Sequence, residues 1–361
     1  MLSERMLTGI VKNITKSHLI IDPTTEKFLP GPEPGRKYML YLHVPFCEVL
    51  CPYCSFNRYP FRETTARPYF KNLRREMMML KDMGYDFESL YFGGGTPTIL
   101  LDELCRTIDM AGENFNIKEV ACETNPNHLV DPWLSALSGR VNRLSVGVQS
   151  FNNELLTQMD RCKKYGSGEE ILERIGNAAS RFDSLNVDMI FNFPSQTEEI
   201  LLDDIEKIKQ CGCRQTTFSP LYVSSATTRK MEQSLGTMDY NREFEFYKML
   251  DEGLCGGDTP AFKRETVWTF NRLNEKGEQD HELPVEELQV SYDPAIGSGS
   301  ISYLNGKLYV NTFSLHEYNE AIERGHMSIM GQMPVREHDH MRYCFLLGLY
   351  QLRFDKRAFK E

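Results

Sequence analysis

The chain has 361 residues, a formal net charge of −10, 41% hydrophobic residues and 25% charged residues, a balance that predicts one large folded domain with or without a small appendage. The acidic total and the lack of any Lys/Arg-dense stretch disfavour a nucleic-acid partner. No apolar run approaches the roughly 20 residues of a membrane span, and the charged N-terminus does not look like a secretory signal, so a cytoplasmic location is expected.

Apolar runs alternate with segments of helical period from residue 37 to about residue 225. Strands are predicted at 37–44, 88–92, 118–123, 141–149, 186–193 and 216–223. Helices are predicted between them at 67–83, 100–115, 130–139, 152–159, 167–182 and 197–212. Repeated β-α units of this kind form parallel sheets, and six units predict an incomplete barrel rather than a closed eight-stranded one. The predicted fold class is therefore α/β, a partial (β/α)6 TIM-like barrel.

The alternation weakens after about residue 225. Segment 293–314 has strand-like alternation around Asn305-Gly306, a strong hairpin signal, and helices are predicted at 315–325 and 338–352. We therefore expect an N-terminal extension of residues 1–36, a barrel of residues 37–225, and a smaller α+β C-terminal domain of residues 226–361.

Three of the ten cysteines, Cys47, Cys51 and Cys54, lie close together with the spacing C-x3-C-x2-C. A structural zinc site commonly takes four ligands as two Cys-x2-Cys pairs, and no second pair follows at that spacing. In a [4Fe–4S] cluster each iron takes one outside ligand, so three cysteines leave one iron open. The loop also follows the first predicted strand, at the catalytic face of a β/α barrel. The pattern predicts an iron–sulfur cluster with an open iron, with zinc or buried thiols as the alternatives.

The stretch YLHVPFCEVLCPYCSF (41–56) resembles the radical S-adenosylmethionine (SAM) superfamily. It is most similar to the oxygen-independent coproporphyrinogen III oxidase-like family, which also holds heme chaperones and anaerobic heme-degrading methyltransferases. The similarity continues through YFGGGTPTIL (91–100), CETNP (122–126), VNRLSVGVQSFN (141–152), NVDMIFNFPSQT (186–197) and, more faintly, IGSGSISY (296–303). The first five of these stretches, in the same order as in the family, carry the resemblance.

The resemblance implies two cofactors. One is a [4Fe–4S] cluster on Cys47, Cys51 and Cys54, and the other is SAM. Some relatives hold a second SAM molecule. In this family the open iron binds the amino and carboxylate groups of SAM, and one electron splits the sulfonium bond to give a 5′-deoxyadenosyl radical. The implied partners are a small organic substrate, with a tetrapyrrole as the candidate, and a reducing protein such as flavodoxin or ferredoxin. No catalytic residue beyond the cofactor site is assigned.

The resemblance also assigns residues to the SAM site. A glycine-rich turn, Gly94-Gly95-Thr96, would offer free N–H groups to the methionine part. Tyr41 would lie near the sulfonium and Tyr53 beside the adenine. The other polar candidates are Glu123 and Gln149 at strand ends, Arg161 twelve residues after Gln149, and Asp188 inside an apolar strand. Arg can hold a carboxylate through two hydrogen bonds. His43 would lie near the cluster, or equally would be a satisfied core histidine.

The sequence departs from its relatives in four ways. Ser55-Phe56 follows Cys54 where coproporphyrinogen oxidases carry a further cysteine, and VWTFNRLNEK (267–276) lacks the His-Asn motif of heme chaperones. Asn192-Phe193-Pro194 replaces the usual Gly-Leu-Pro, and the C-terminal domain is expected to be short. The sequence favours an enzyme that cleaves SAM and acts on an organic substrate, with a tetrapyrrole as the candidate, by oxidase-like or C-methyltransferase-like chemistry. The alternative is a heme-binding chaperone without turnover; an electron carrier is disfavoured by the missing fourth ligand.

Overall fold

The structure of the protein, a computed structural model, describes residues 20–224, 227–278 and 293–353. The strands are β1 (Asp22–Pro23), β2 (Tyr38–Val44), β3 (Phe46–Cys47), β4 (Tyr59–Pro60), β5 (Phe87–Gly94), β6 (Glu119–Thr124), β7 (Arg143–Gln149), β8 (Ser184–Phe191), β9 (Gln215–Pro220), β10 (Phe262–Arg264), β11 (Thr269–Arg272), β12 (Ala295–Ile296), β13 (Ile301–Leu304), β14 (Lys307–Asn311) and β15 (Ile329–Pro334). The helices are α2 (Glu63–Asp82), α3 (Leu101–Asn114), α4 (Trp133–Leu137), α5 (Asn153–Gln158), α6 (Cys162–Tyr165), α7 (Gly168–Ala178), α8 (Glu198–Gln210), α9 (Thr228–Leu235), α10 (Glu243–Cys255), α11 (Leu315–Glu323) and α12 (Glu337–Tyr350).

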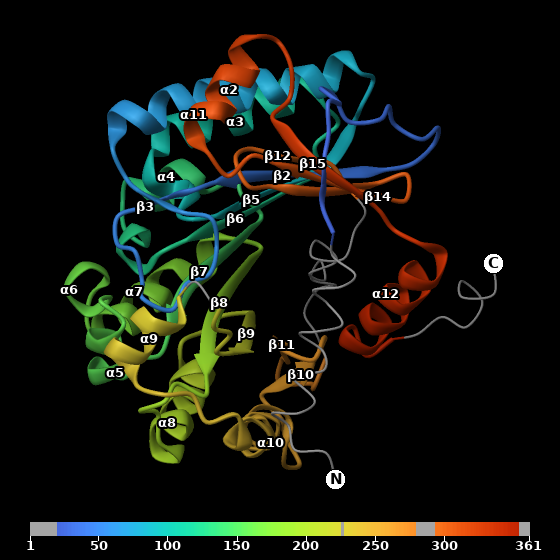
Figure 1. Ribbon diagram of the computed structural model, residues 1–361. Coiled ribbons are helices and arrows are strands. Elements are labelled where there is room, and N and C mark those ends of the chain that lie inside the picture. The colour runs from blue at the N-terminus through green and yellow to red at the C-terminus, as the bar shows by residue number, and fades with distance from the viewer. Residues whose placement is uncertain (1–19, 225–226, 279–292, 354–361) are drawn as a thin grey trace.

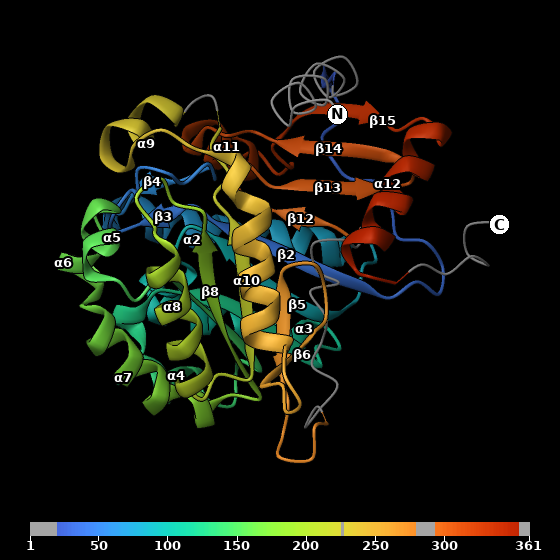
Figure 2. The same cartoon turned by 90° about the horizontal axis from the view of Figure 1, so that it is seen from below.

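One nine-stranded sheet, in the order β10-β11-β9-β8-β7-β6-β5-β2-β12, forms the centre of the molecule. Its six central strands, β2 and β5 to β9, pair in parallel and are the six strands predicted from the sequence. Helices α2, α3, α4, α7 and α8 lie outside the curved sheet (Figures 1 and 2). The predicted α/β fold, a partial barrel of six β-α units, is therefore confirmed.

The parallel strands are buried on both faces, as expected when helices cover a sheet. In β2 only Tyr41 is not fully buried, and the central strands supply much of one continuous apolar core. These helices bury apolar side chains along one side, the side that packs on the sheet. Helix α7 buries Ile171 and Ile175, four residues apart, and begins at a capping box in which Ser167 and Glu170 cap each other's backbone N–H groups. Local capping and apolar spacing thus position each helix against the sheet.

Residues after 226 complete both edges of this sheet. The β10–β11 hairpin pairs antiparallel to β9, and the two-residue strand β12 pairs in parallel with β2. The predicted hairpin at Asn305-Gly306 is confirmed, with φ of 50° and 73° at its two turn residues joining β13 to β14. A second sheet, β1-β15-β14-β13, stands beside the barrel. The division at residues 36/37 and 225/226 stays a prediction.

Two details differ from the sequence-based expectations. Helix α2 begins at Glu63, four residues before the predicted start, so that Pro68 lies inside the helix, and Arg67 Nε pairs with Glu63 Oε1 at 2.6 Å. The polar segment 258–278, where no strand was predicted, contains the β10–β11 hairpin. Of the predicted terminal domains, residues 1–19, 279–292 and 354–361 lie outside the described residues. Within the described ranges, no helix is both long enough and apolar enough to span a membrane.

Candidate functional site

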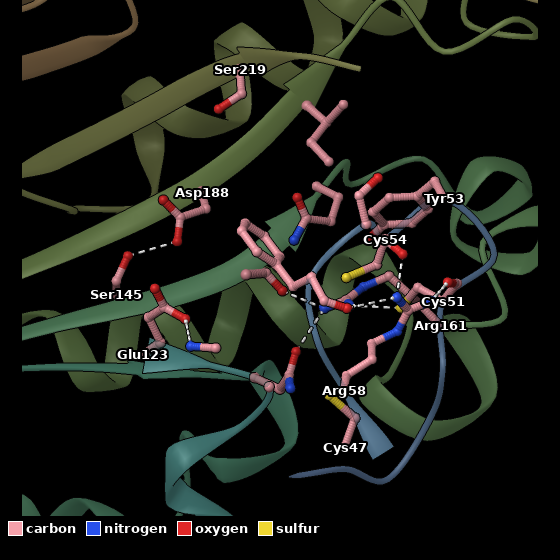
Figure 3. Close-up of a pocket in the computed structure, with 18 of the residues that line it drawn as sticks. Cys47, Cys51, Tyr53, Cys54, Arg58, Glu123, Ser145, Arg161, Asp188 and Ser219 are labelled. Atoms are coloured by element: carbon pink, nitrogen blue, oxygen red, sulfur yellow. Dashed lines mark hydrogen bonds between the residues drawn. The ribbon is translucent and has the colours of Figure 1, made fainter. Parts of the chain in front are cut away.

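A cavity of about 520 Å³ opens at the carboxyl ends of the barrel strands (Figure 3). Ten of the twelve predicted cofactor and metal residues line it: Cys47, Cys51, Tyr53, Cys54, Gly94, Gly95, Glu123, Gln149, Arg161 and Asp188. Tyr41 and Thr96 lie outside the lining. Residues from five strands and the cysteine loop thus meet at one place, at the edge where ligand sites of β/α barrels lie.

The cysteine loop is held from one side by Arg58. Its guanidinium donates to the backbone carbonyl of Cys51 at 2.6 Å and also to that of Cys54. Both bonds are charge-assisted, and the planar fork of arginine suits two neighbouring acceptors. Arg58 therefore fixes the two later cysteines relative to each other, and it also lines the cavity.

Glu48 holds the other side of the loop. Its carboxylate, directly after Cys47, forms an ion pair with Lys164 Nζ at 2.7 Å and accepts from Asn127 Nδ2 at 2.8 Å. His128 Nε2 lies 3.7 Å away and is buried, which lowers the pKa of His128 to about 4 and keeps the ring neutral. The loop is thus tied to α6 and to the turn after β6.

The three thiols line the same cavity. Burial raises the pKa of the Cys47 thiol to about 12 and also raises the pKa of Cys54, so a metal must displace the protons for these groups to act as thiolate ligands. Among the described residues no three His, Cys, Asp or Glu side chains surround one point closely enough to hold a single metal ion. Zinc, with Zn–S bonds of about 2.3 Å, needs such a convergence. In a cubane, by contrast, each thiolate binds a different iron.

Arg161 is a buried cation that bonds one of these thiols. It is only 4% exposed, and its Nη1 donates to Cys51 Sγ at 3.4 Å while Nη2 donates to Asn125 Oδ1 at 3.0 Å and to the Gly147 carbonyl. The guanidinium also stacks 4.3 Å above the Tyr165 ring. Its Nε has no hydrogen-bond partner within the part of the chain that the structure describes. A buried donor left unsatisfied beside a cavity is a place where a ligand oxygen fits.

Two carboxylates occupy the opposite wall (Figure 3). Glu123, near the end of β6, accepts from Tyr91 Oη at 2.7 Å and from the Gly94 N–H at 3.1 Å. Asp188, inside β8, accepts from Ser145 Oγ at 2.6 Å and from Asn186 Nδ2 at 2.7 Å. Each carboxylate is thus oriented by neighbouring strands, and a carboxylate has about four acceptor positions, so ligand hydroxyl or ammonium groups can be bound in addition.

The glycine-rich turn serves the packing of the protein. A Cβ at Gly94, where φ is 112°, would meet the His43 ring at 2.5 Å, and one at Gly95 would meet the Phe46 carbonyl at 2.6 Å. The N–H of Gly94 bonds Glu123, that of Gly95 bonds Val44, and that of Thr96 bonds Phe46. The expectation that these N–H groups are free is therefore wrong in this structure, because the turn uses them to fasten β5 to β2 and to the cysteine loop.

The remaining predicted residues fall into two places. Tyr53 is buried in the lining, edge-on to Phe193 with ring centroids 5.9 Å apart. Tyr41 and Thr96 do not line the cavity but contact residues that do. The Tyr41 ring stacks on the Tyr91 ring with centroids 5.7 Å apart, and Thr96 Oγ1 donates to Cys47 Sγ at 3.8 Å. Gln149, at the end of β7, lines the cavity with φ at 78°.

His43 is a satisfied core histidine. It is buried, and its two ring nitrogens lie 3.0 Å from Tyr41 Oη and 3.0 Å from the Asn57 carbonyl. Burial lowers its pKa. Cys211 and Cys213 are likewise buried core residues at the end of α8, and Cys211 Sγ donates to the Ile208 carbonyl at 3.2 Å.

Asn192 explains one departure of the sequence from its relatives. Its φ is 65°, in the left-handed region that glycine and asparagine tolerate best. Its side chain donates to the Asp239 carbonyl at 3.1 Å and is not part of the cavity lining. The side chain that replaces a glycine here therefore leaves the cavity open.

Several residues of the site were not predicted. Arg58, Tyr91, Asn125 and Ser145 orient predicted residues, and Thr217 and Ser219 add a polar strip from β9. Asn125 and Tyr91 fall inside stretches that carry the family resemblance, so their position at strand ends was a usable signal. Ser145 also falls inside such a stretch, 141–152. Arg58 had no such signal, because its role depends on contacts across the fold.

Comparison with known proteins agrees with this geometry. The Radical SAM superfamily matches residues 41–208. The chain is 35% identical over 330 residues to the heme chaperone HemW of Bacillus subtilis (strain 168), covering 89% of this chain and 86% of that one. It is 27% identical over 350 residues to an oxygen-independent coproporphyrinogen III oxidase of Helicobacter pylori, covering 89% and 74% of the two chains.

The fold is also shared with a solved structure. Coproporphyrinogen III oxidase (HemN) from Escherichia coli, described as a radical SAM enzyme, superposes with a TM-score of 0.74 at 22% identity, covering 91% of this chain and 79% of that chain. The family match, the relative at 35% identity and the partial barrel point the same way. The chain belongs to the radical SAM superfamily, within the oxygen-independent coproporphyrinogen III oxidase-like family that includes the heme chaperones.

Proposed function

We propose that the protein is a radical SAM enzyme with a [4Fe–4S] cluster on Cys47, Cys51 and Cys54, acting on an organic substrate. The observation that carries the proposal is that the three thiols line the same cavity as Arg161 and the two carboxylates. A bound cluster and SAM would supply a 5′-deoxyadenosyl radical, which abstracts hydrogen from the substrate. The names of the relatives make a tetrapyrrole the substrate to test first.

Arg161 is suited to bind the carboxylate of SAM. It lies beside Cys51 Sγ, and its buried Nε lacks a partner among the described residues. A carboxylate there would satisfy this donor through a charge-assisted bond. Gln149 lines the same side of the cavity and offers an amide donor. The proposed role of Arg161 is thus to orient the amino-acid end of SAM toward the cysteine loop.

Glu123 and Asp188 are suited to the other polar parts of SAM. Tyr91 and the Gly94 N–H hold Glu123, while Ser145 and Asn186 hold Asp188, so each carboxylate is oriented before ligand arrives. Glu123 lines the same cavity as the cysteines and would accept from the ammonium group, and Asp188 would accept from ribose hydroxyls. Tyr53 would pack against the adenine and exclude water.

A heme chaperone is the second candidate, because the Bacillus subtilis relative at 35% identity bears that name. The two functions differ in one measurable product. An enzyme makes 5′-deoxyadenosine from SAM, whereas a chaperone without turnover binds heme tightly and makes none.

The test is an anaerobic reconstitution with iron and sulfide, followed by SAM and a strong reductant. We expect 5′-deoxyadenosine in the wild type and none in Cys51→Ala. S-adenosylhomocysteine, measured in the same samples, would show methyl transfer, and methylthioadenosine, which keeps the methyl group, would show cleavage of the bond between the sulfonium and the aminocarboxypropyl group. Tight heme binding without deoxyadenosine would replace this proposal with the chaperone, and an unchanged yield in Cys51→Ala would detach the activity from the cysteine loop. A reducing protein such as flavodoxin or ferredoxin is the proposed physiological donor, and one or two SAM molecules can be counted by equilibrium binding.

A further inference from the structure

The last residues of β7 depart from a regular strand. Two consecutive residues of β8 pair with Gly147 and Gln149, so Val148 is an extra residue and forms a β-bulge. Gln149 then has φ of 78°, in the left-handed region that residues with a Cβ seldom adopt. Such a conformation persists only where the surrounding structure holds it in place. The bulge therefore needs support from outside the strand.

The bulge shapes one side of the cavity. Gly147 and Gln149 both line the cavity. A Cβ at Gly147 would meet Gln149 Nε2 at 2.9 Å, so the Gln149 amide lies over the Gly147 backbone. The Gly147 carbonyl also accepts from Arg161 Nη2. The backbone at 147–149 therefore determines where the Gln149 amide and the Arg161 guanidinium lie relative to each other.

Asp204 holds the chain directly after the bulge. It is a buried residue of α8, the helix that lies outside the curved sheet (Figure 2). Its Oδ2 accepts from Ser150 Oγ at 2.8 Å, and its Oδ1 accepts from the Phe151 N–H at 2.7 Å. Both oxygens of one carboxyl group thus bond the two residues that follow Gln149.

The same turn starts the helix that leads to Arg161. Ser150 Oγ accepts from the Asn152 N–H at 3.0 Å, and the Asn152 side chain caps the start of α5. After α5, the Arg161 N–H donates to the Leu156 carbonyl at 2.8 Å. Asp204 is therefore linked through this turn to the backbone of Arg161 as well as to the bulge.

The carboxyl group of Asp204 is costly to bury. Burial raises its pKa from 3.8 to about 7, although the two donors act in the opposite direction. An apolar side chain would fill the same space on α8 without this cost, but it could not bond the Ser150 hydroxyl and the Phe151 N–H. The turn after β7, rather than the packing of α8, therefore requires the carboxyl group.

We propose that Asp204 is a positioning residue for SAM, which holds the β7 bulge so that Gln149 and Arg161 meet the amino-acid end of the ligand. This inference rests on the proposed function, in which Arg161 binds the SAM carboxylate and Gln149 lies on the same side of the cavity. Asp204 is not part of the cavity lining and acts through the turn. Its loss should weaken SAM binding and leave the iron content unchanged.

Equilibrium dialysis of SAM against the anaerobically reconstituted protein tests this role. Asp204→Ala loses both hydrogen bonds and should raise the Kd for SAM about tenfold. Asp204→Asn keeps both contacts, because its Oδ1 accepts from the Phe151 N–H and its amide donates to the Ser150 hydroxyl, so its Kd should stay within about twofold of the wild type. Asp203→Ala is the matched control, because the neighbouring Asp203 is exposed and pairs with Lys207.

A second variant and a second measurement cover the case in which Asp204→Ala does not fold. Ser150→Ala removes one of the two bonds, keeps the one from Phe151, and should raise the Kd for SAM about threefold. Hydrogen exchange of the amides at 149–152, measured by mass spectrometry without SAM, reports on the turn directly. Exchange there should be faster in Ser150→Ala than in the wild type, and unchanged in Asp203→Ala.

The outcomes separate this inference from the proposed function. A wild-type Kd in folded Asp204→Ala or in Ser150→Ala, or an Asp204→Asn as weak as Asp204→Ala, would overturn the positioning role. Iron lost together with SAM affinity, or unchanged exchange at 149–152, would overturn it as well. Deoxyadenosine formation is measured on the same wild-type sample. SAM binding that depends on Asp204 without deoxyadenosine would overturn the proposed function alone, and a wild type that binds no SAM would overturn both.

Discussion

The cysteine loop shows how single charged side chains determine the geometry of a ligand set. Glu48 lies next to Cys47, and Arg58 bonds the carbonyls of Cys51 and Cys54, so charged groups hold both ends of the loop. Burial raises the pKa values of the Cys47 and Cys54 thiols, which therefore do not hold the loop through charge of their own. The loop is thus positioned for its ligands mainly by Lys164, Asn127 and Arg58.

Neighbouring lysines provide a matched test of this support. Lys164 pairs with Glu48 at 2.7 Å, whereas no contact of Lys163 with the loop is present among the described residues. Because partly exposed ion pairs contribute about 0.2–1 kcal/mol, Lys164→Ala should speed the loss of iron from the reconstituted protein to a chelator by up to about fivefold. Lys163→Ala should lose iron at the wild-type rate. Equal rates of iron loss in both variants would show that the loop holds iron equally well without the Glu48–Lys164 ion pair.

At the scale of elements, the end of β8 depends on one backbone conformation. Asn192 has φ of 65° and bonds the Asp239 carbonyl, so it turns the chain sharply after the strand. Asn192→Gly should lose only the hydrogen bond, about 1 kcal/mol. Asn192→Ala should lose the bond and also replace asparagine by a residue that tolerates the left-handed region less well, for a total of about 2–3 kcal/mol. Urea unfolding measures both variants, and equal losses would contradict the backbone explanation.

The elements also show which strands sequence patterns can predict. The six central strands were predictable because each is a short apolar run between helical segments, and burial on both faces requires such a run. Strand β12 lies within segment 293–314, where alternation predicted strands, but the pattern did not show that its two residues pair with the edge of β2. The β10–β11 hairpin is likewise polar in sequence and forms on the edge of β9. The pairing of these segments therefore depends on partners far along the chain, which hydrophobic periodicity does not reveal.

The residues of the site divide in the same way, into those that sequence patterns predict and those that depend on contacts across the fold. Cys47 and Glu123 were found because strand ends of a parallel sheet meet at one edge, and Asp188 because a carboxylate inside an apolar strand needs hydrogen-bond partners. All three also lie in motifs that resemble a known family. Arg58 escaped prediction because its acceptors are backbone carbonyls, which every sequence contains. The use of the Gly94 and Gly95 N–H groups was predicted wrongly, because only the three-dimensional packing shows that Glu123 and β2 already bind the turn.

At the scale of the whole molecule, one buried carboxyl group joins the barrel to the second sheet. Glu76, on α2, accepts from Tyr318 Oη at 2.7 Å, from the Gly297 N–H at 2.9 Å and from Asn311 Nδ2 at 3.4 Å. These partners come from α11, the loop after β12, and β14. Burial raises the pKa of Glu76 from 4.5 to about 7, although the three donors act in the opposite direction.

The raised pKa makes the stability of this junction depend on pH. Between about pH 4.5 and pH 7 the folded protein keeps a proton on Glu76 that the unfolded chain has released, so the free energy of unfolding falls as pH rises through this window. The full contribution is about 3 kcal/mol, since a tenfold change in proton affinity corresponds to about 1.4 kcal/mol. It is fully present below pH 4.5 and is lost above pH 7.

Glu76→Gln removes this titration, because an amide stays neutral throughout the window. The stability advantage of the wild type over Glu76→Gln, measured by urea unfolding, should therefore be about 3 kcal/mol larger at pH 4.5 than at pH 7.5. The comparison cancels other titrating groups, because both proteins share them. Glu113→Gln, an exposed change of the same kind on α3, is the control substitution and is measured at the same two pH values. A constant difference between wild type and Glu76→Gln across the window would mean that the junction binds Glu76 in one protonation state throughout.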